Sequence, residues 1–243
     1  MLEFEHVFFS YEKEQPILTD VSFKIAPGEQ LGLIGANGTG KSTILKILLG
    51  LLPCTGGVRV GGLPVEKACL PQIRRKLGYV LQDSDNQMFM PTVYEDMIFA
   101  PLNYGLSRTE ADARVDETLQ QLALTHLKRR HNHKMSGGEK RMAAIATILA
   151  LRPEALLMDE PSIALDPCNR RRLIHILRAL PLTKIIASHD LDLILETCDR
   201  VLLLSGGRIA ADGPASELLR DRALLEAHRL ELPLCLSGCP EGR

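Results

Sequence analysis

Residues 35–43 read Gly-Ala-Asn-Gly-Thr-Gly-Lys-Ser-Thr, the P-loop pattern G-x-x-x-x-G-K-S, between an apolar run ending at Ile34 and a helix-like run starting at Ile44. Glycines let the backbone wrap phosphates with N–H groups in conformations that a Cβ would forbid, and the following helix adds the positive end of its dipole. Lys41 is expected to reach the β- and γ-phosphates and Ser42 to ligate Mg²⁺. The other residues predicted to contact the nucleotide here are Gly35, Asn37, Gly38, Thr39, Gly40 and Thr43.

The length and charge of the chain limit the fold classes and the partners that we consider. Its 243 residues suit one large α/β domain, or a core with a smaller inserted subdomain. The 29 Lys and Arg nearly balance the 30 Asp and Glu, so bulk charge indicates neither nucleic acid nor an anionic membrane surface as a partner. The first six residues include acids where a signal peptide would carry bases, and no apolar stretch approaches the ~18 residues that span a bilayer. We therefore expect a cytoplasmic protein that reaches a membrane only through another protein.

Strand patterns dominate before residue 82. Short β-branched or aromatic runs predict strands at 2–10, 21–25, 28–34, 56–62 and 77–81, with a polar segment between the first two.

From residue 83 to about 150 the pattern is helical. Capping boxes at Thr92–Glu95 and Ser107–Glu110 predict two helix starts, and the second opens a helix with apolar residues on one face, namely Val115, Leu119 and Leu122. We expect this stretch to be a helical subdomain inserted in a domain of residues 1–220, with residues 221–243 as a C-terminal tail.

In the second half, strands alternate with helices. Strands are predicted at 156–158, 184–187 and 201–204, and helices at about 169–180 and after His189. Such alternation indicates a parallel sheet with crossover helices and a binding crevice at the carboxyl ends of the strands.

Residues 155–161 form an apolar run that ends in two carboxylates before a proline. An apolar strand delivers charge only at its end, where the crevice lies. Asp159 is placed to hold Mg²⁺, and Glu160 to orient and deprotonate an attacking water. A strand ending in acids before a proline turn is common, so this interpretation depends on the P-loop.

Residues 135–139, Met-Ser-Gly-Gly-Glu, support two readings that can hold together. Ser136 and Glu139 form a capping box for the next helix, and an exposed helix start with two glycines also makes an anion site. This motif resembles the Leu-Ser-Gly-Gly-Gln/Glu signature of ATP-binding cassette (ABC) ATPases. The resemblance runs from about Leu2 to Leu219, with the family's motifs in order.

The resemblance implies a fold and further roles. The fold is an α/β P-loop NTPase, with a RecA-like, mostly parallel sheet, an antiparallel β subdomain and the inserted helical subdomain. Tyr11 matches the aromatic that stacks on adenine, and Gln82 the glutamine that joins the Mg²⁺ site to the helical subdomain. Residues 162–166 match a loop that crosses the dimer interface, and His189 the histidine that senses the γ-phosphate. Taken singly, Tyr11, Gln82 and His189 could each be structural residues.

The resemblance also implies a mechanism. Two copies, or the chain and a paralogue, associate head to tail, so that ATP on one P-loop is closed in trans by Ser136 and Gly138 of the other. Loss of the γ-phosphate removes the anion between them, and hydrolysis becomes an opening motion.

Residues 82–89 and 91–103 resemble the ATPases of energy-coupling-factor (ECF) importers, with departures at Ser84, Asn86 and Ala100. The resemblance implies a groove for a coupling helix of a transmembrane scaffold, a separate substrate-binding membrane subunit, and a place on the cytoplasmic face of the membrane. Cobalt or nickel is the expected cargo. The alternatives are a vitamin-type ECF importer or another ABC transporter, and a soluble ABC ATPase outside transport. A cassette without turnover and a P-loop kinase or GTPase fit the motifs less well.

Two features stay open. The tail carries Cys235 and Cys239 at C-x-x-x-C spacing, and His131 and His133 precede the signature. A transition metal could suit either, but a reduced tail and a solvated loop are the simpler interpretations. The six cysteines lack a paired framework and are expected to be reduced thiols: Cys54, Cys69, Cys168, Cys198, Cys235 and Cys239.

Overall fold

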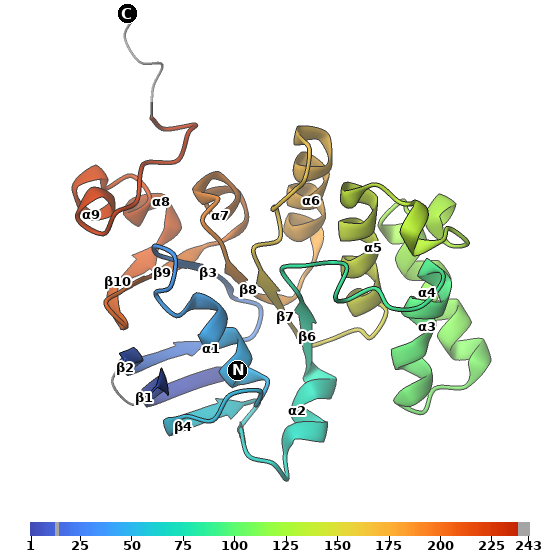
Figure 1. The fold of residues 1–243 in the computed structure, drawn as a ribbon, viewed down its shortest axis with the longest axis horizontal. Coiled ribbons are helices and arrows are strands. Elements are labelled where there is room, and N and C mark those ends of the chain that lie inside the picture. Colours follow the sequence, from blue (N-terminus) through green and yellow to red (C-terminus); the bar gives the residue numbers. More distant parts are fainter. Residues whose placement is uncertain (13–14, 238–243) are drawn as a thin grey trace, which may run out of the picture.

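The computed structural model describes residues 1–12 and 15–237. Its centre is a six-stranded sheet with strand order β10-β9-β3-β8-β7-β6 (Figure 1). Strands β9, β3, β8, β7 and β6 are parallel, and β10 is antiparallel to β9. The bounds are β3 Gln30–Ile34, β6 Leu77–Val80, β7 Ala155–Asp159, β8 Thr183–Ala187, β9 Arg200–Ser205 and β10 Arg208–Pro214. The parallel sheet predicted from the alternating pattern is confirmed.

Helices connect these strands and cover them. β3 leads through the P-loop into α1 (Lys41–Leu48), and β7 and β8 are followed by α6 (Pro167–Ala179) and α7 (Leu191–Thr197). β7 and β8 are buried at every residue, as expected when both faces of a parallel sheet are covered. The sheet therefore directs the ends of β3, β7 and β8 to one edge.

A second, antiparallel sheet has the order β2-β1-β4-β5. Helix α1 lies between it and the main sheet (Figure 1), and one apolar cluster joins all three. The bounds are β1 Leu2–Glu12, β2 Gln15–Ile25, β4 Thr55–Val60 and β5 Leu63–Pro64, and the short α2, Leu70–Lys76, leads from this sheet into β6.

The prediction that a polar segment separates the first two strands is wrong for the described residues from Gln15 onward. β2 already begins there and pairs with β1 as a hairpin. Irregular register hides the strand's alternation, because Asp20 has a left-handed φ of 58° and its carboxylate lies 2.7 Å from Nδ1 of His6. The stretch from Gln15 to Asp20 is thus part of a strand whose bulge hides the usual alternation of buried and exposed residues.

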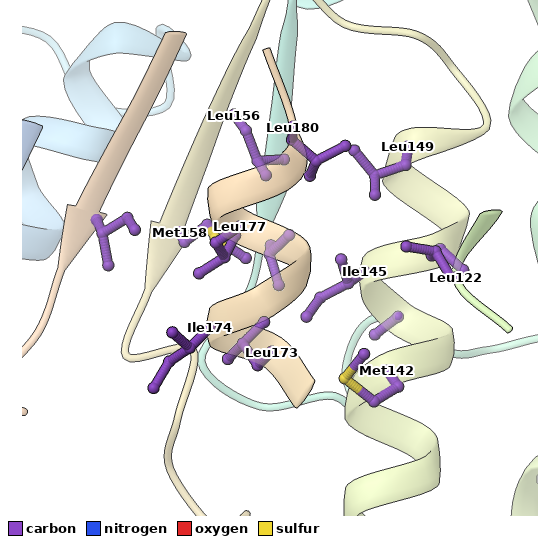
Figure 2. Packing of buried hydrophobic residues seen from close by; sticks show 14 of the residues in the cluster. Leu122, Met142, Ile145, Leu149, Leu156, Met158, Leu173, Ile174, Leu177 and Leu180 are labelled. Carbon is purple, nitrogen blue, oxygen red and sulfur yellow. The ribbon is translucent and has the colours of Figure 1, made fainter. Parts of the chain in front are cut away.

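The helical stretch forms a separate layer at one end of the molecule (Figure 1). Its helices are α3 Val93–Asn103, α4 Arg108–Gln121 and α5 Gly137–Leu149, with 3₁₀ turns at Thr125–Leu127 and Asn132–Lys134. All three predicted capping boxes are present, and the predicted apolar face of α4 is buried. Figure 2 shows Met142, Ile145 and Leu149 of α5 directed toward the apolar face of α6.

The chain after β10 continues as α8 (Ala215–Leu218) and α9 (Arg222–Ala227). Leu225 is fully buried, and the backbone N–H groups of Leu234 and Cys235 each donate to the carboxylate of Asp192 at 3.0 Å. The described part of the predicted tail is therefore anchored on the core. Cys239 lies outside the described residues.

Candidate functional site

A cavity of about 590 Å³ opens where β3, β7 and β8 end. Volumes of ~300–1,000 Å³ are typical of small-molecule sites. Its lining brings together predicted residues from distant parts of the chain: Tyr11, Gly35, Asn37, Gly38, Gly40, Lys41, Ser42, Thr43, Gln82, Asp159, Glu160 and His189. Thr39 lies beside it, and its hydroxyl donates to the carbonyl of Ala36 at 2.9 Å, which holds the loop closed.

The P-loop needs its glycines for two reasons. Gly35 and Gly40 have positive φ of 145° and 104°, which other residues rarely adopt. A Cβ on Gly35 would lie 2.3 Å from the carbonyl oxygen of Leu204. The following helix α1 has no side-chain cap at Gly40 and no acidic residue in its first turn. Its unpaired N–H groups and dipole are therefore open to an anion.

Lys41 lies in the floor of the cavity and is nearly buried. Its ammonium donates to the carbonyls of Gly35 at 2.7 Å and Ala36 at 3.1 Å. Burial lowers the pKa of Lys41, and the charges of Glu160 and Asp159 oppose that shift. The ammonium is thus held beside the loop that would wrap the phosphates.

Asp159, the last residue of β7, faces Ser42 across the cavity floor. Both side chains line the cavity, and the hydroxyl of Tyr79 donates to the Asp159 carboxylate at 3.4 Å. Burial raises the pKa of Asp159, and the nearby Ser42 hydroxyl opposes the shift. A carboxylate beside a hydroxyl, with Gln82 lining the same cavity, fits the oxygen ligands that Mg²⁺ prefers.

Glu160 directly follows and turns into the cavity with a left-handed φ of 47°. Its carboxylate accepts from Ser188 Oγ at 2.9 Å and from the backbone N–H of His189 at 3.1 Å, and His189 Nδ1 lies 2.8 Å away. The strained backbone and three polar contacts fix this carboxylate beside the phosphate loop. Ser188 was not predicted, although it precedes His189 at the same strand end.

Tyr11 lies at the mouth of the cavity, on β1. Its side chain is 58% exposed, and its ring packs edge-on against Phe9 at 4.7 Å between centroids. Its hydroxyl lies 3.4 Å from Oγ1 of Thr43. An exposed ring held in this way provides a platform for a planar base.

Arg141 is a residue that the sequence interpretation missed. It lies on α5, is 2% exposed, and donates to five backbone carbonyls. These belong to Leu81, Gln82, Asp159, Glu160 and Pro161. Burial lowers the pKa of Arg141 to about 10, so it stays charged at neutral pH. The signal in the sequence was an arginine within an otherwise apolar helix face.

Ser136 and Gly138, the predicted trans residues, lie at the start of α5 and do not line this cavity. Ser136 accepts from the backbone N–H of Glu139 at 3.2 Å, and Glu139 accepts from that of Ser136 at 2.8 Å. A Cβ on Gly138 would lie 2.5 Å from the amide nitrogen of Asn169, so this glycine also allows α5 to approach α6.

Neither the two histidines before the signature nor the described cysteines form a metal site in the part of the chain that the structure describes. The rings of His131 and His133 lie 5.5 Å apart, but no group of three or more potential ligands gathers anywhere in residues 1–12 and 15–237.

The family model for ABC transporters matches residues 18–163, and the chain belongs to this family of ATP-binding cassettes. A putative ABC transporter ATP-binding protein of Geobacter sulfurreducens is 45% identical to this chain over 241 residues, which cover 99% of this chain and 97% of that protein. The chain is therefore an ABC ATPase, and the P-loop and the paired carboxylates lie within the matched residues.

Two other relatives and one solved structure indicate its type. The cobalt import ATP-binding protein CbiO of Rhodobacter capsulatus is 42% identical over 97% of this chain and 86% of its own. The energy-coupling factor transporter ATP-binding protein EcfA of Methanothermobacter thermautotrophicus is 40% identical over 96% and 77%. The structure of CbiO1 from Clostridium perfringens, part of the CbiONQ transporter complex, superimposes with a TM-score of 0.83 at 32% identity, over 96% and 95%. The resemblance to ECF-type cassettes is confirmed.

Within the described residues, every helix is too short or too polar to cross a lipid bilayer.

Proposed function

We propose that this chain is the ATP-hydrolysing subunit of an ECF-type importer and works as a head-to-tail dimer with a second copy or a paralogue. One observation carries the proposal. A single cavity holds Lys41, Asp159, Glu160 and His189, while the signature helix start at Ser136 lies elsewhere. The residues that we expect to act in catalysis share one cavity, whereas the anion site that would close it lies on another surface.

The cavity residues divide the chemistry between them. Lys41 and the P-loop amides would bind the β- and γ-phosphates, and Asp159, Ser42 and Gln82 would hold Mg²⁺. The metal, when bound, neutralises charge on the phosphates. Glu160 would accept the proton of the attacking water, because its carboxylate faces the same cavity. His189, in contact with Glu160, lies where it can meet the γ-phosphate.

A membrane partner is supported by an exposed aromatic pair. Phe89 is 63% exposed and Phe99 41%, and their rings pack edge-on at 5.2 Å between centroids. The carboxylate of Asp96 accepts from the N–H of Phe89 at 3.1 Å and holds this surface in place. The pair lies in the segment that resembles ECF ATPases, and an apolar coupling helix of a transmembrane scaffold fits it. The chain would then be peripheral, on the cytoplasmic face.

Co-purification tests this proposal. The tagged chain is expressed with its membrane neighbours, and the proteins recovered in detergent are identified. We expect a transmembrane scaffold and a substrate-binding membrane subunit. Phe89→Ser should release them while ATP hydrolysis by the isolated chain persists, whereas Phe8→Ser, a control 43% exposed on β1, should retain them. Recovery of soluble proteins or nucleic acid alone would refute the transporter role.

Cobalt or nickel is the proposed cargo, because one relative is named as a cobalt import protein and the similar solved structure comes from the CbiONQ complex. Uptake of labelled cobalt or nickel by cells that express the complex should depend on Glu160. Uptake of a vitamin instead, with no metal uptake, would contradict the cargo and leave the ATPase assignment unchanged.

A further inference from the structure

Arg229 occupies an unfavourable backbone position next to the nucleotide cavity. It follows α9 with a left-handed φ of 61°. The backbone N–H of Leu230 donates to the carbonyl of Leu225 at 2.9 Å, and that of Arg229 to Glu226 at 3.1 Å. This is a helix termination in which glycine is the usual residue, because a Cβ is strained there. Arg229 therefore keeps a strained backbone conformation beside the cavity.

Arg229 lies beside the phosphate loop. It lines the cavity formed by the P-loop, Glu160 and His189, and it also lines a groove with Asn37 and Gly38. Leu230 lines the same cavity and packs against the apolar core, which fixes the chain beside the P-loop. The position of Arg229 is therefore set by packing on one side and by the phosphate loop on the other.

The guanidinium of Arg229 has no carboxylate within ion-pair distance in the described part of the chain, although it shares a groove with Asp190 and Glu231. Nearby arginines have carboxylate partners: Arg171 pairs with Glu196, and Arg222 with Glu226. Arg229 is exposed and takes part in none of the ion pairs of residues 1–12 and 15–237. A planar guanidinium is suited to phosphate oxygens, to which it donates two parallel hydrogen bonds.

We propose that Arg229 binds the γ-phosphate of ATP from the C-terminal segment. The γ-phosphate is favoured because Arg229 shares its cavity with Glu160 and His189 at the hydrolytic end. This inference rests on the ATPase activity of the family and is independent of the importer and cargo proposals.

The test uses Arg229→Gly in the full-length chain, with Glu160→Gln in both proteins so that ATP stays intact. Glycine removes the guanidinium and relieves the left-handed strain, so thermal stability without nucleotide should stay equal or rise. Equilibrium titration should show ATP affinity reduced about tenfold, the lower range for a charged hydrogen bond, and ADP affinity within about twofold. Arg222→Ala, on α9 with an exposed side chain, is the control and should leave both affinities unchanged.

The experiment distinguishes a failure of the Arg229 inference from a failure of the ATPase assignment. ATP binding by Arg229→Gly as tight as that of its Glu160→Gln parent would overturn the inference, and so would an equal loss of ATP and ADP affinity. If the parent protein failed to bind Mg²⁺-ATP, or if Lys41→Ala bound it equally well, the ATPase assignment itself would fail instead.

Discussion

Arg141→Lys tests how the helical subdomain is connected to the catalytic strand. Arg141 donates to five carbonyls, whereas the three donors of lysine diverge from a single nitrogen, so at least two buried carbonyls lose their partner. Each unsatisfied buried group costs ~1–3 kcal/mol, which gives a loss of about 2–6 kcal/mol for two. Native domains are stable by only ~5–15 kcal/mol, so the effect should be large.

Urea unfolding and steady-state ATPase kinetics measure the effect. With a slope near ~3 kcal/mol/M, the unfolding midpoint should fall by roughly 0.7–2 M. kcat should fall at least about tenfold with KM nearly unchanged, because Arg141 holds the backbone of Gln82 and Glu160 and does not line the nucleotide cavity. Arg114→Lys is the matched control, since Arg114 donates to one carbonyl at 3.5 Å. A stability within ~0.5 kcal/mol of wild type, with unchanged kcat, would refute the reasoning.

Three further predictions follow from the site. Glu160→Gln should keep ATP binding while slowing hydrolysis by at least ~10²-fold, the usual contribution of a general base; near-normal turnover in a phosphate-release assay would exclude that role. Asp159→Asn should abolish Mg²⁺-dependent turnover yet raise the thermal midpoint of the nucleotide-free chain, because burial disfavours the ionised carboxylate; a lower midpoint in calorimetry would contradict this. Burial acts to raise the pKa of Asp190, but the two hydrogen bonds from Arg170 outweigh it and hold this pKa below its usual range. The Arg170–Asp190 pair therefore stabilises the fold at pH values above the ordinary aspartate pKa. This stabilisation is lost as the pH falls through the lowered pKa. Arg170→Ala should therefore cost about 2–4 kcal/mol at pH 7 and move the acid-unfolding limb to higher pH, and superimposable pH-stability curves would count against the pair.

The sequence predicted those parts of the site that depend on local pattern. Three features were predicted in this way: the P-loop, the strand ending in Asp159, and the capping boxes. In each, a run of apolar residues with helix or strand spacing adjoins a position where the local structure requires one residue type. Because parallel strands end at one edge, the positions of Glu160 and His189 after apolar strands agree with their contact in the structure, which the sequence analysis did not itself predict. The role of Ser136 and Gly138 in trans came from family resemblance and stays a proposal, because one chain does not contain the surface that they would face.

Other parts depend on long-range packing, which no local pattern encodes. Arg141 and its acceptors are far apart in the sequence, so only the fold brings them together. The strand β2 was obscured by the bulge at Asp20, which interrupts the alternation of buried and exposed residues. Arg229 had no motif, and its meaning depends on its φ and on the segment that returns to the P-loop.

The same short helix start connects the two proposed halves of the ATPase cycle. α5 begins at the signature glycines, which in the proposed dimer would face the γ-phosphate of a partner chain. One turn later its Arg141 holds the carbonyls of Gln82 and Glu160 in its own site. Because the helix is rigid over one turn, a displacement of its first residues by a partner's phosphate must move Arg141 or break its hydrogen bonds. Binding at one site would thus change the position of Glu160 in the other, which is the physical requirement for two sites to act in turn.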